Sequence, residues 1–413
     1  MRLFHRFALF SATIFFTSGL LADTIERSSE NPQRDIEALR EWINTRRQVT
    51  VKEIGGALSI SGEVRTEFQA TTETVNGIKQ RGHGGATPIN SRAYDVEVNI
   101  MIDYRADRTW AAIKLEFDND AGIFSGTFNK IKLEKAYFGA RLVKQDTHVI
   151  DLEIGRRKMG TILDSKLEFN SFFDGAYLKY DRAYEKVGDF YAHAGIFVIN
   201  ERVNQYGFVG EFGLLDIRNT GVYAKYSIID WDTKDTEDRV RRQQFDFIIS
   251  QFILGYKFIP KYFLKKVVIL YAAGLYNHEA EPIAISDFKK ANKGGYLGVS
   301  IGELRKQGDW AFDGNYQVLQ AQAVPDFDIS GIGLGNANDS GFYTLKVDGK
   351  GGPTTRKTAA GNGNYRGFVL TLEYLFTNNL NLQQQWQQSI TLDKSIGPFR
   401  RFKQYEMELV YLF

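Results

Sequence analysis

The chain contains no cysteine among its 413 residues. A disulfide framework, a thiolate metal site, a cysteine nucleophile and a lipoprotein-type anchor are therefore excluded. Proline is scarce as well, with 7 residues, whereas glycine (39), tyrosine (21) and phenylalanine (31) are abundant. This composition favours many strands that are joined by turns.

Histidine is also rare, and its 5 residues are too far apart in the sequence to indicate a local metal pair. They are His5, His83, His148, His193 and His278. No serine or aspartate accompanies them in a recognisable catalytic motif, so the sequence does not predict an enzyme such as a barrel hydrolase. Two glycine-rich stretches, 331–339 and 348–355, lack the spacing of a dinucleotide or phosphate loop, and we expect no cofactor.

The N-terminal residues 1–22 have the pattern of a secretory signal peptide. Arg2 and Arg6 supply the positive start, an apolar stretch covers 7–21, and Ala22 is the expected last residue of the signal. Without this segment the chain is about neutral, which argues against a nucleic-acid partner.

A long hydrophobic run is missing from the rest of the chain. The most apolar stretch, 245–260, is interrupted by Asp246, Ser250 and Lys257, so it does not predict a transmembrane helix. The remaining choice is between a soluble secreted protein and a β-barrel in an outer membrane.

Residues 23–54 are polar and have a helical pattern. Ile36, Leu39, Trp42 and Ile43 fall on one face of the expected helix. We interpret this N-terminal segment as a small periplasmic cap or self-association helix, with a plug in the barrel as the alternative.

Apolar and polar residues alternate from Gly56 onward. In the stretch 94–104, Val96, Val98 and Ile100 share one face, and polar side chains occupy the other. The repeated pattern predicts an all-β fold over 55–413, a closed antiparallel barrel of about 16 strands, with about 14 or about 18 as alternatives. The expected strands lie near 57–71, 92–105, 109–118, 130–143, 147–157, 172–182, 187–199, 205–216, 219–231, 242–258, 263–276, 292–303, 308–323, 364–376, 379–391 and 399–413.

Short and long connections alternate between these expected strands. The short ones include 105–109, 184–189 and 377–380, whereas the long ones include 72–91 and 324–363. Short turns at one end and long loops at the other are the expected layout of an outer-membrane barrel. Such a barrel pairs every backbone group inside the bilayer, and its polar inner face requires a water-filled lumen.

The last nine residues, YEMELVYLF, place Tyr405, Met407, Leu409, Tyr411 and Phe413 at alternate positions. Together with the signal peptide, the alternating strands and the sorted loops, this terminus resembles the C-terminal signature of bacterial outer-membrane porins. The early stretch SGEVRTEF is similar to a porin group found in chlamydia-like and related bacteria.

The resemblance implies a passive channel in the outer membrane of a Gram-negative bacterium that carries small hydrophilic solutes and ions. It also implies a homotrimer, and an assembly machinery that reads the final strand at Tyr405, Tyr411 and Phe413. The alternative function is that of an outer-membrane adhesin or structural surface barrel whose long loops, above all 324–363, bind a partner.

Charges in the lumen of such a channel would set its ion preference. We expect the third long loop to fold inward, so that Asp164 and Glu168 face Arg65, Arg141 and Arg157 across a constriction. In the alternative, the charges line a wide, solvated lumen without selecting any solute. Further expected pore-lining residues are Lys135, Glu97, Glu116, Lys114, Lys179, Glu63, Asp151 and Glu153.

Aromatic residues near the expected strand ends are interpreted as belts at the two membrane interfaces. They are Tyr104, Trp110, Tyr226, Trp231 and Trp386.

Overall fold

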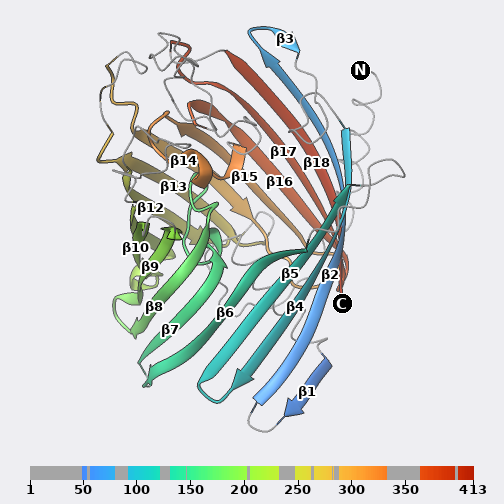
Figure 1. Cartoon of the computed structure of the whole chain (residues 1–413), viewed down its shortest axis with the longest axis vertical. Helices are drawn as coiled ribbons and strands as arrows, with labels where there is room; N and C mark the ends of the chain where they lie inside the picture. Colours follow the sequence, from blue (N-terminus) through green and yellow to red (C-terminus); the bar gives the residue numbers. More distant parts are fainter. Residues whose placement is uncertain are drawn as a thin grey trace.

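The computed structural model describes residues 49–53, 56–79, 92–120, 131–145, 147–201, 205–231, 247–261, 265–280, 282, 288–332, 363–395 and 399–413. Within these residues, 16 strands form one closed antiparallel barrel (Figure 1), which confirms the predicted fold class. They are β2 (Gly56–Val75), β4 (Arg92–Ala106), β5 (Thr109–Asp120), β6 (Ile131–Lys144), β7 (His148–Lys158), β8 (Phe172–Tyr184), β9 (Gly188–Asn200), β10 (Gln205–Leu215), β11 (Val222–Asp230), β12 (Ile248–Phe258), β13 (Val268–Asn277), β14 (Lys293–Ile301), β15 (Trp310–Leu319), β16 (Tyr365–Thr377), β17 (Leu380–Thr391) and β18 (Arg400–Leu412).

The terminal strand closes the barrel. Each barrel strand pairs with its neighbours in sequence, and β18 pairs with β2 from Arg400↔Val75 to Leu412↔Glu63. The main chains of Phe413 and Gly62 then exchange two hydrogen bonds of 2.9 Å. A Cβ atom on Gly62 would lie 2.6 Å from the Phe413 ring, so only glycine leaves room for it. Closure leaves no unpaired edge strand in the barrel.

Two short strands pair with the two ends of β2. Strand β1 (Val49–Glu53) pairs with its start and β3 (Ile78–Lys79) pairs with its end. Val49–Glu53 belongs to the N-terminal segment 23–54 that the sequence predicts as helical, so this part of the prediction is wrong. Its alternation of β-branched and polar residues suits a strand. The expected signal peptide and helix lie outside the described residues.

Most strand bounds agree with the sequence pattern to within a few residues. The main correction concerns the strand expected over 308–323, because β15 ends at Leu319 and the chain then turns. Residues 320–323 alternate amide-bearing and apolar side chains, and this alternation leads the sequence prediction to continue the strand through them. In the structure, Ala321 and Ala323 are instead buried in the interior.

The two faces of the sheet differ in chemistry. On β12, for example, Phe252 and Leu254 are 51% and 49% exposed on the outside, whereas Gln251 and Ile253, which alternate with them, are buried inside. The same alternation places Leu409 outside and Glu408 inside on β18. The outer face is thus apolar, and much of the inner face is polar or charged.

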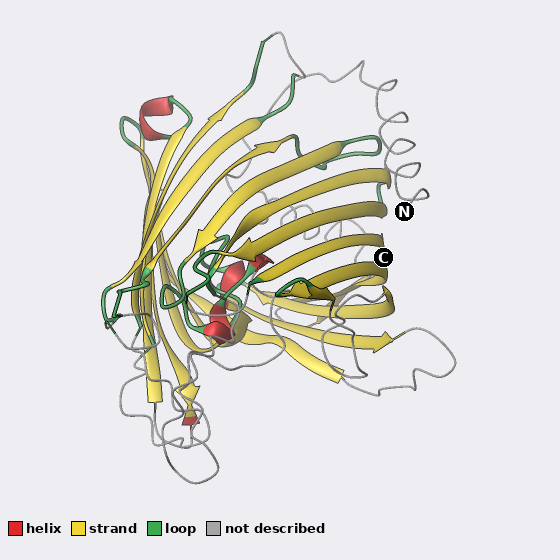
Figure 2. Ribbon diagram, turned by 90° about the horizontal axis from the view of Figure 1, so that it is seen from above, coloured by secondary structure: helices red, strands yellow, loops and turns green. Residues whose placement is uncertain are grey.

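Two connecting segments fold into the barrel and cover part of its inner wall. The inward segment, residues 159–171, begins with the short turn η1 (Met159–Thr161), and the second segment, residues 320–332, contains η5 (Asp326–Asp328). Figure 2 shows short helical turns and loops lying within the curve of the sheet. Their apolar residues pack against inner-face side chains of β8–β16 in one buried cluster. No helix among the described residues is long and apolar enough to cross a membrane.

Candidate channel lumen

The inner wall over β18, β2, β4 and β5 is strongly acidic. Strand pairing aligns Glu408 with Glu67 and Asp95, and Arg65 with Glu97, so the charges stand in rows across the wall. Among the described residues, acidic side chains outnumber basic ones here. The acids are Glu406, Glu408, Glu63, Glu67, Glu73, Asp95, Glu97, Asp103, Glu116 and Asp118, and the bases are Arg400, Arg65, Arg105 and Lys114.

Arg65 is the central cation of this wall. Its guanidinium lies 3.0 Å from a Glu63 oxygen and 3.4 Å from a Glu408 oxygen. Asn99 donates one hydrogen bond of 2.8 Å to Glu63 and another to Glu97. Arg65 therefore forms ion pairs with more than one carboxylate, and acidic groups remain in excess on this wall.

Three carboxylates gather beside Arg65. Oxygens of Glu67, Glu406 and Glu408 lie within 4.8 Å of one another, and Gln69 donates to both Glu67 and Glu406. Oxygen donors of this kind suit a hard cation such as Ca²⁺. Within the part of the chain that the structure describes, no other group of three histidines or acids is placed to hold a metal ion.

The wall over β5–β8 pairs acids with bases. Arg141 makes two hydrogen bonds, of 2.8 and 3.0 Å, to Asp151. Glu153 binds both Arg157 and Lys179, the latter at 2.8 Å. Some of these groups keep contact with solvent, since the Lys179 side chain is 22% exposed. Lys132 likewise pairs with Glu116 at 2.6 Å and with Asp118 at 3.0 Å.

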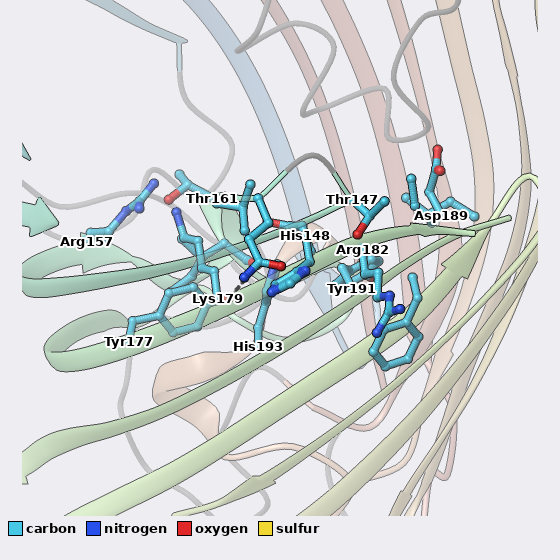
Figure 3. A pocket seen from close by; sticks show the side chains of 17 residues that line it. Thr147, His148, Arg157, Thr161, Tyr177, Lys179, Arg182, Asp189, Tyr191 and His193 are labelled. Atoms are coloured by element: carbon cyan, nitrogen blue, oxygen red, sulfur yellow. Dashed lines mark hydrogen bonds between the residues drawn. The ribbon is translucent and has the colours of Figure 1, made fainter. Parts of the chain in front are cut away.

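A cavity of about 570 Å³ lies beside β7–β9 at the foot of the inward segment. Thr161 of the inward segment and Arg157, Lys179 and His193 of the wall line it. Figure 3 shows Arg157 near one end of the row of lining side chains and Asp189 near the other. A polar solute in this cavity would meet groups of both charges.

The inward segment is fastened to the opposite part of the wall. Asp164 forms an ion pair of 2.9 Å with Lys225 on β11, and its carbonyl accepts a 2.7 Å hydrogen bond from Gln251 on β12. Ser165 donates to Gln251 at 2.7 Å, and Lys166 lies 3.3 Å from Asp313 on β15. The segment therefore narrows the barrel by lying against β10–β15.

Asp164 and Glu168 do not share the environment that the sequence suggests. Glu168 is only 1% exposed, so it cannot face an arginine across open water. It lies between Leu167 and Phe169 in a packed stretch, and packing turns all three side chains away from solvent. Asp164 reaches Lys225, a residue that the sequence does not single out.

The other expected pore-lining residues lie on the inner face and pair within their own wall. Arg65 binds Glu63 and Glu408. Arg141 binds Asp151, and Arg157 binds Glu153. Glu97 accepts from Asn99, Glu116 binds Lys132, and Lys135 lies 5.6 Å from the centre of the Tyr137 ring. Each of these partners lies on the same strand or on a neighbouring one.

Sequence reasoning missed three features of the site. They are the cluster that includes Glu67, the buried cation Lys225, and Asp328 in the second inward segment. Only the carboxylate cluster could have been anticipated from the sequence, because Glu406 and Glu408 alternate with apolar residues in the terminal strand and so share its inner face.

Of the expected assembly-signal residues, Tyr405 lies near the middle of β18, Tyr411 near its end, and Phe413 just beyond it. Tyr411 and Phe413 are about half exposed on the outer surface, and Tyr405 donates a 3.0 Å hydrogen bond to Gln384. Recognition of this strand by an assembly machinery stays a prediction.

Two aromatic residues that were expected at membrane interfaces lie inside. Trp110 donates to Glu153 at 3.2 Å, and Trp231 is 2% exposed beside Phe197. Trp110 falls on an inward position of β5, and Trp231 directly follows β11 where the alternation again points inward. The alternation of faces therefore decides their side, not their place near a strand end. Trp386 does lie outside and is half exposed.

One histidine has a serine neighbour that no sequence motif indicates. The Ser250 hydroxyl lies 2.7 Å from Nε2 of His278 and 2.8 Å from the Tyr226 hydroxyl, all on the outer face. In the described part of the chain, His278 has no carboxylate partner for its other ring nitrogen. The pair therefore lacks the third group that orients a catalytic histidine.

Bacterial porins are among the solved structures to which this chain is similar. Pseudomonas putida OprB at high pH has a TM-score of 0.49 and 9% identity, over 86% of this chain and 94% of that chain. Salmonella typhi OmpF in complex with daunomycin has a TM-score of 0.49 and 13% identity, over 88% and 100%. A substituted variant of the Rh. blastica porin has a TM-score of 0.45 and 11% identity, over 86% and 100%. No family model and no curated protein matches the sequence.

Proposed function

We propose that this protein is an outer-membrane porin, a passive channel for small hydrophilic solutes and ions. The observation that carries the proposal is the sorting of the two faces of a closed barrel. Its outer face exposes large apolar side chains, whereas its inner face holds charged groups that keep contact with solvent. An apolar exterior suits hydrocarbon, and a charged interior suits water.

The proposed passage runs along the acidic wall over β18, β2, β4 and β5. The inward segment occupies the side of β10–β15, so solutes would pass between it and this wall. Carboxylates that exceed their counter-charges attract cations and repel anions. We therefore expect the channel to prefer small cations.

Liposome swelling tests the passage of solutes. The purified protein, reconstituted in phospholipid vesicles, should admit small uncharged sugars and exclude larger ones in order of size. Folded protein that leaves the vesicles impermeable to every sugar would contradict the proposal. An adhesin or structural barrel would give that second result.

Reversal potentials in a salt gradient test the ion preference. A carboxylate about 8 Å from a passing ion attracts a cation by about 0.5 kcal/mol in water. Each carboxylate attracts a cation and repels an anion, so replacing Glu67 and Glu406 together by glutamine should lower the cation-to-anion permeability ratio by about five- to thirtyfold at pH 9, with salt screening at the low end. Glu185→Gln, in the exposed turn between β8 and β9, is the matched control. An unchanged ratio in the double variant would contradict the role of the acidic wall.

We further propose that three copies assemble, as expected for a large porin. Native mass spectrometry of the detergent-solubilised protein should give a trimer that dissociates on heating. A stable monomer that conducts would contradict this oligomeric state and leave the channel proposal intact.

A further inference from the structure

The second inward segment, residues 320–332, holds the first one through its backbone. The Asp328 carboxylate accepts hydrogen bonds from the main-chain nitrogens of Phe169 (3.1 Å) and Ser171 (3.0 Å). The main chain adds two more, from Asn170 to the Asp328 carbonyl and from Ser330 to the Leu167 carbonyl. One buried carboxylate therefore fixes the C-terminal half of the inward segment.

Glu168 lies in the middle of this contact and has no such partners. It is 1% exposed, and among the described residues neither of its oxygens has a hydrogen-bond partner. A buried carboxylate without partners is costly when it is charged. Burial first, and then the charges of Asp328 and Glu211, raise the pKa of Glu168 well above its ordinary value. Burial also raises the pKa of Asp328 to about 7, although the hydrogen bonds that it accepts act in the opposite direction.

The elements packed around Glu168 offer two cations, and both are already paired. Lys166 lies 3.3 Å from Asp313, and Lys225 binds Asp164 at 2.9 Å. Glu211 accepts from Tyr191 at 2.8 Å and from the main-chain nitrogen of Asp164 at 3.0 Å. The charged and titratable groups facing this region are Asp328, Glu211, Lys225, Asp164, Tyr296, Lys166 and Asp313. Acids prevail among them, so ionisation of Glu168 meets repulsion.

We propose that Asp328 and Glu168 form a proton-dependent latch: Asp328 holds the inward segment against the wall, the hold requires a neutral Glu168, and the channel therefore widens as the medium becomes alkaline. This inference rests on the proposed channel function for its consequence, but the latch itself is a property of the fold.

The sign of the pH effect follows from proton linkage. A carboxyl whose pKa is higher in the latched state than its ordinary value of about 4 binds its proton more tightly there. Its contribution to latching is complete below about pH 4 and declines as the pH rises through the raised value. The decline passes through about pH 7 for Asp328 and continues above it for Glu168.

Two substitutions should act in opposite directions. Asp328→Ala removes the acceptor for two main-chain donors, and we expect main-chain amides in 165–171 to exchange hydrogen at least about tenfold faster at every pH. Glu168→Met keeps the volume but removes the second ionisable group, so only the decline through about pH 7 that Asp328 contributes should remain, without the further loss above it. Asp309→Ala is the matched control, because Asp309 also accepts from two main-chain nitrogens, those of Arg305 and Lys306, in a remote turn.

Hydrogen exchange of the folded, full-length protein is the primary test, with protection factors of peptides from 159–171 measured between pH 6 and pH 9. The wild type should lose protection as the pH rises, Asp328→Ala should lack it throughout, and Glu168→Met should show only the part of the loss that falls near pH 7. Wild-type protection in Asp328→Ala, or the same alkaline loss in Glu168→Met as in the wild type, would overturn the latch.

The size cut-off for polyethylene glycols in planar-bilayer recordings is the second readout. Asp328→Ala should admit larger polymers than the wild type and Asp309→Ala, and an identical cut-off would overturn the role of the latch in setting the aperture. A wild type that passes no current would refute the proposed channel function, whereas hydrogen exchange would still decide the latch.

Discussion

A charge placed on the outer face tests whether that face lies in lipid. Leu254 is suited to this because it lies near the middle of β12 and is 49% exposed on the outside. Arginine at the midplane of a transmembrane barrel costs about 2–4 kcal/mol. This corresponds to a change of about 30- to 800-fold in the ratio of folded to unfolded protein. At an exposed site of a soluble protein, the same substitution would change stability by about 0.5 kcal/mol or less.

Reversible unfolding in phospholipid vesicles, followed by tryptophan fluorescence during a urea titration, measures this difference. Leu254→Arg should lower the midpoint of the titration strongly without changing its slope. Val187→Arg is the control, since Val187 is 46% exposed in the turn between β8 and β9. There we expect a loss of about 0–1 kcal/mol, as found near the membrane interfaces. Equal and small losses at both positions would refute the assignment of the outer face to lipid.

Two further predictions concern the closing strand and the anchor of the inward segment. Deleting Phe413 should reduce the yield of folded barrel far more than the conductance of barrels already assembled, because Phe413 completes the pairing with Gly62; a normal yield, measured by heat-modifiable gel mobility, would contradict this. Lys225→Met should destabilise the barrel by up to about 3–5 kcal/mol, because it leaves the Asp164 carboxylate, which is only 13% exposed, without its cation. Adding Asp164→Asn should restore most of that stability in urea titrations, and a loss under about 1 kcal/mol in the single variant would contradict the buried pair.

The barrel strands could be predicted because their signal is local. Side chains alternate with a period of two along every strand, so a stretch such as 94–104 reveals both the strand and its two faces. The same rule places Glu408 inside and Leu409 outside on the final strand, as the structure does. The error at β15 has a related cause, because residues 320–323 continue a pattern that a strand could use.

The contacts within the lumen could not be predicted from spacing. Asp164 and Lys225 are 61 residues apart, and Phe169 and Asp328 are 159 residues apart. These pairs form only because the inward segment crosses to the far wall and meets a second segment there. Glu168 shows the limit most clearly, since its charge suggests a solvated lumen whereas its flanking apolar residues draw it into the core.

The central claim is that the barrel encloses a water-filled passage, and single-channel recording in a planar bilayer tests it most directly. Wild-type protein added at low concentration should produce steady current steps, and in a salt gradient their reversal potential should indicate a preference for cations. Protein that is shown to insert as a folded barrel but produces no current steps would contradict the account.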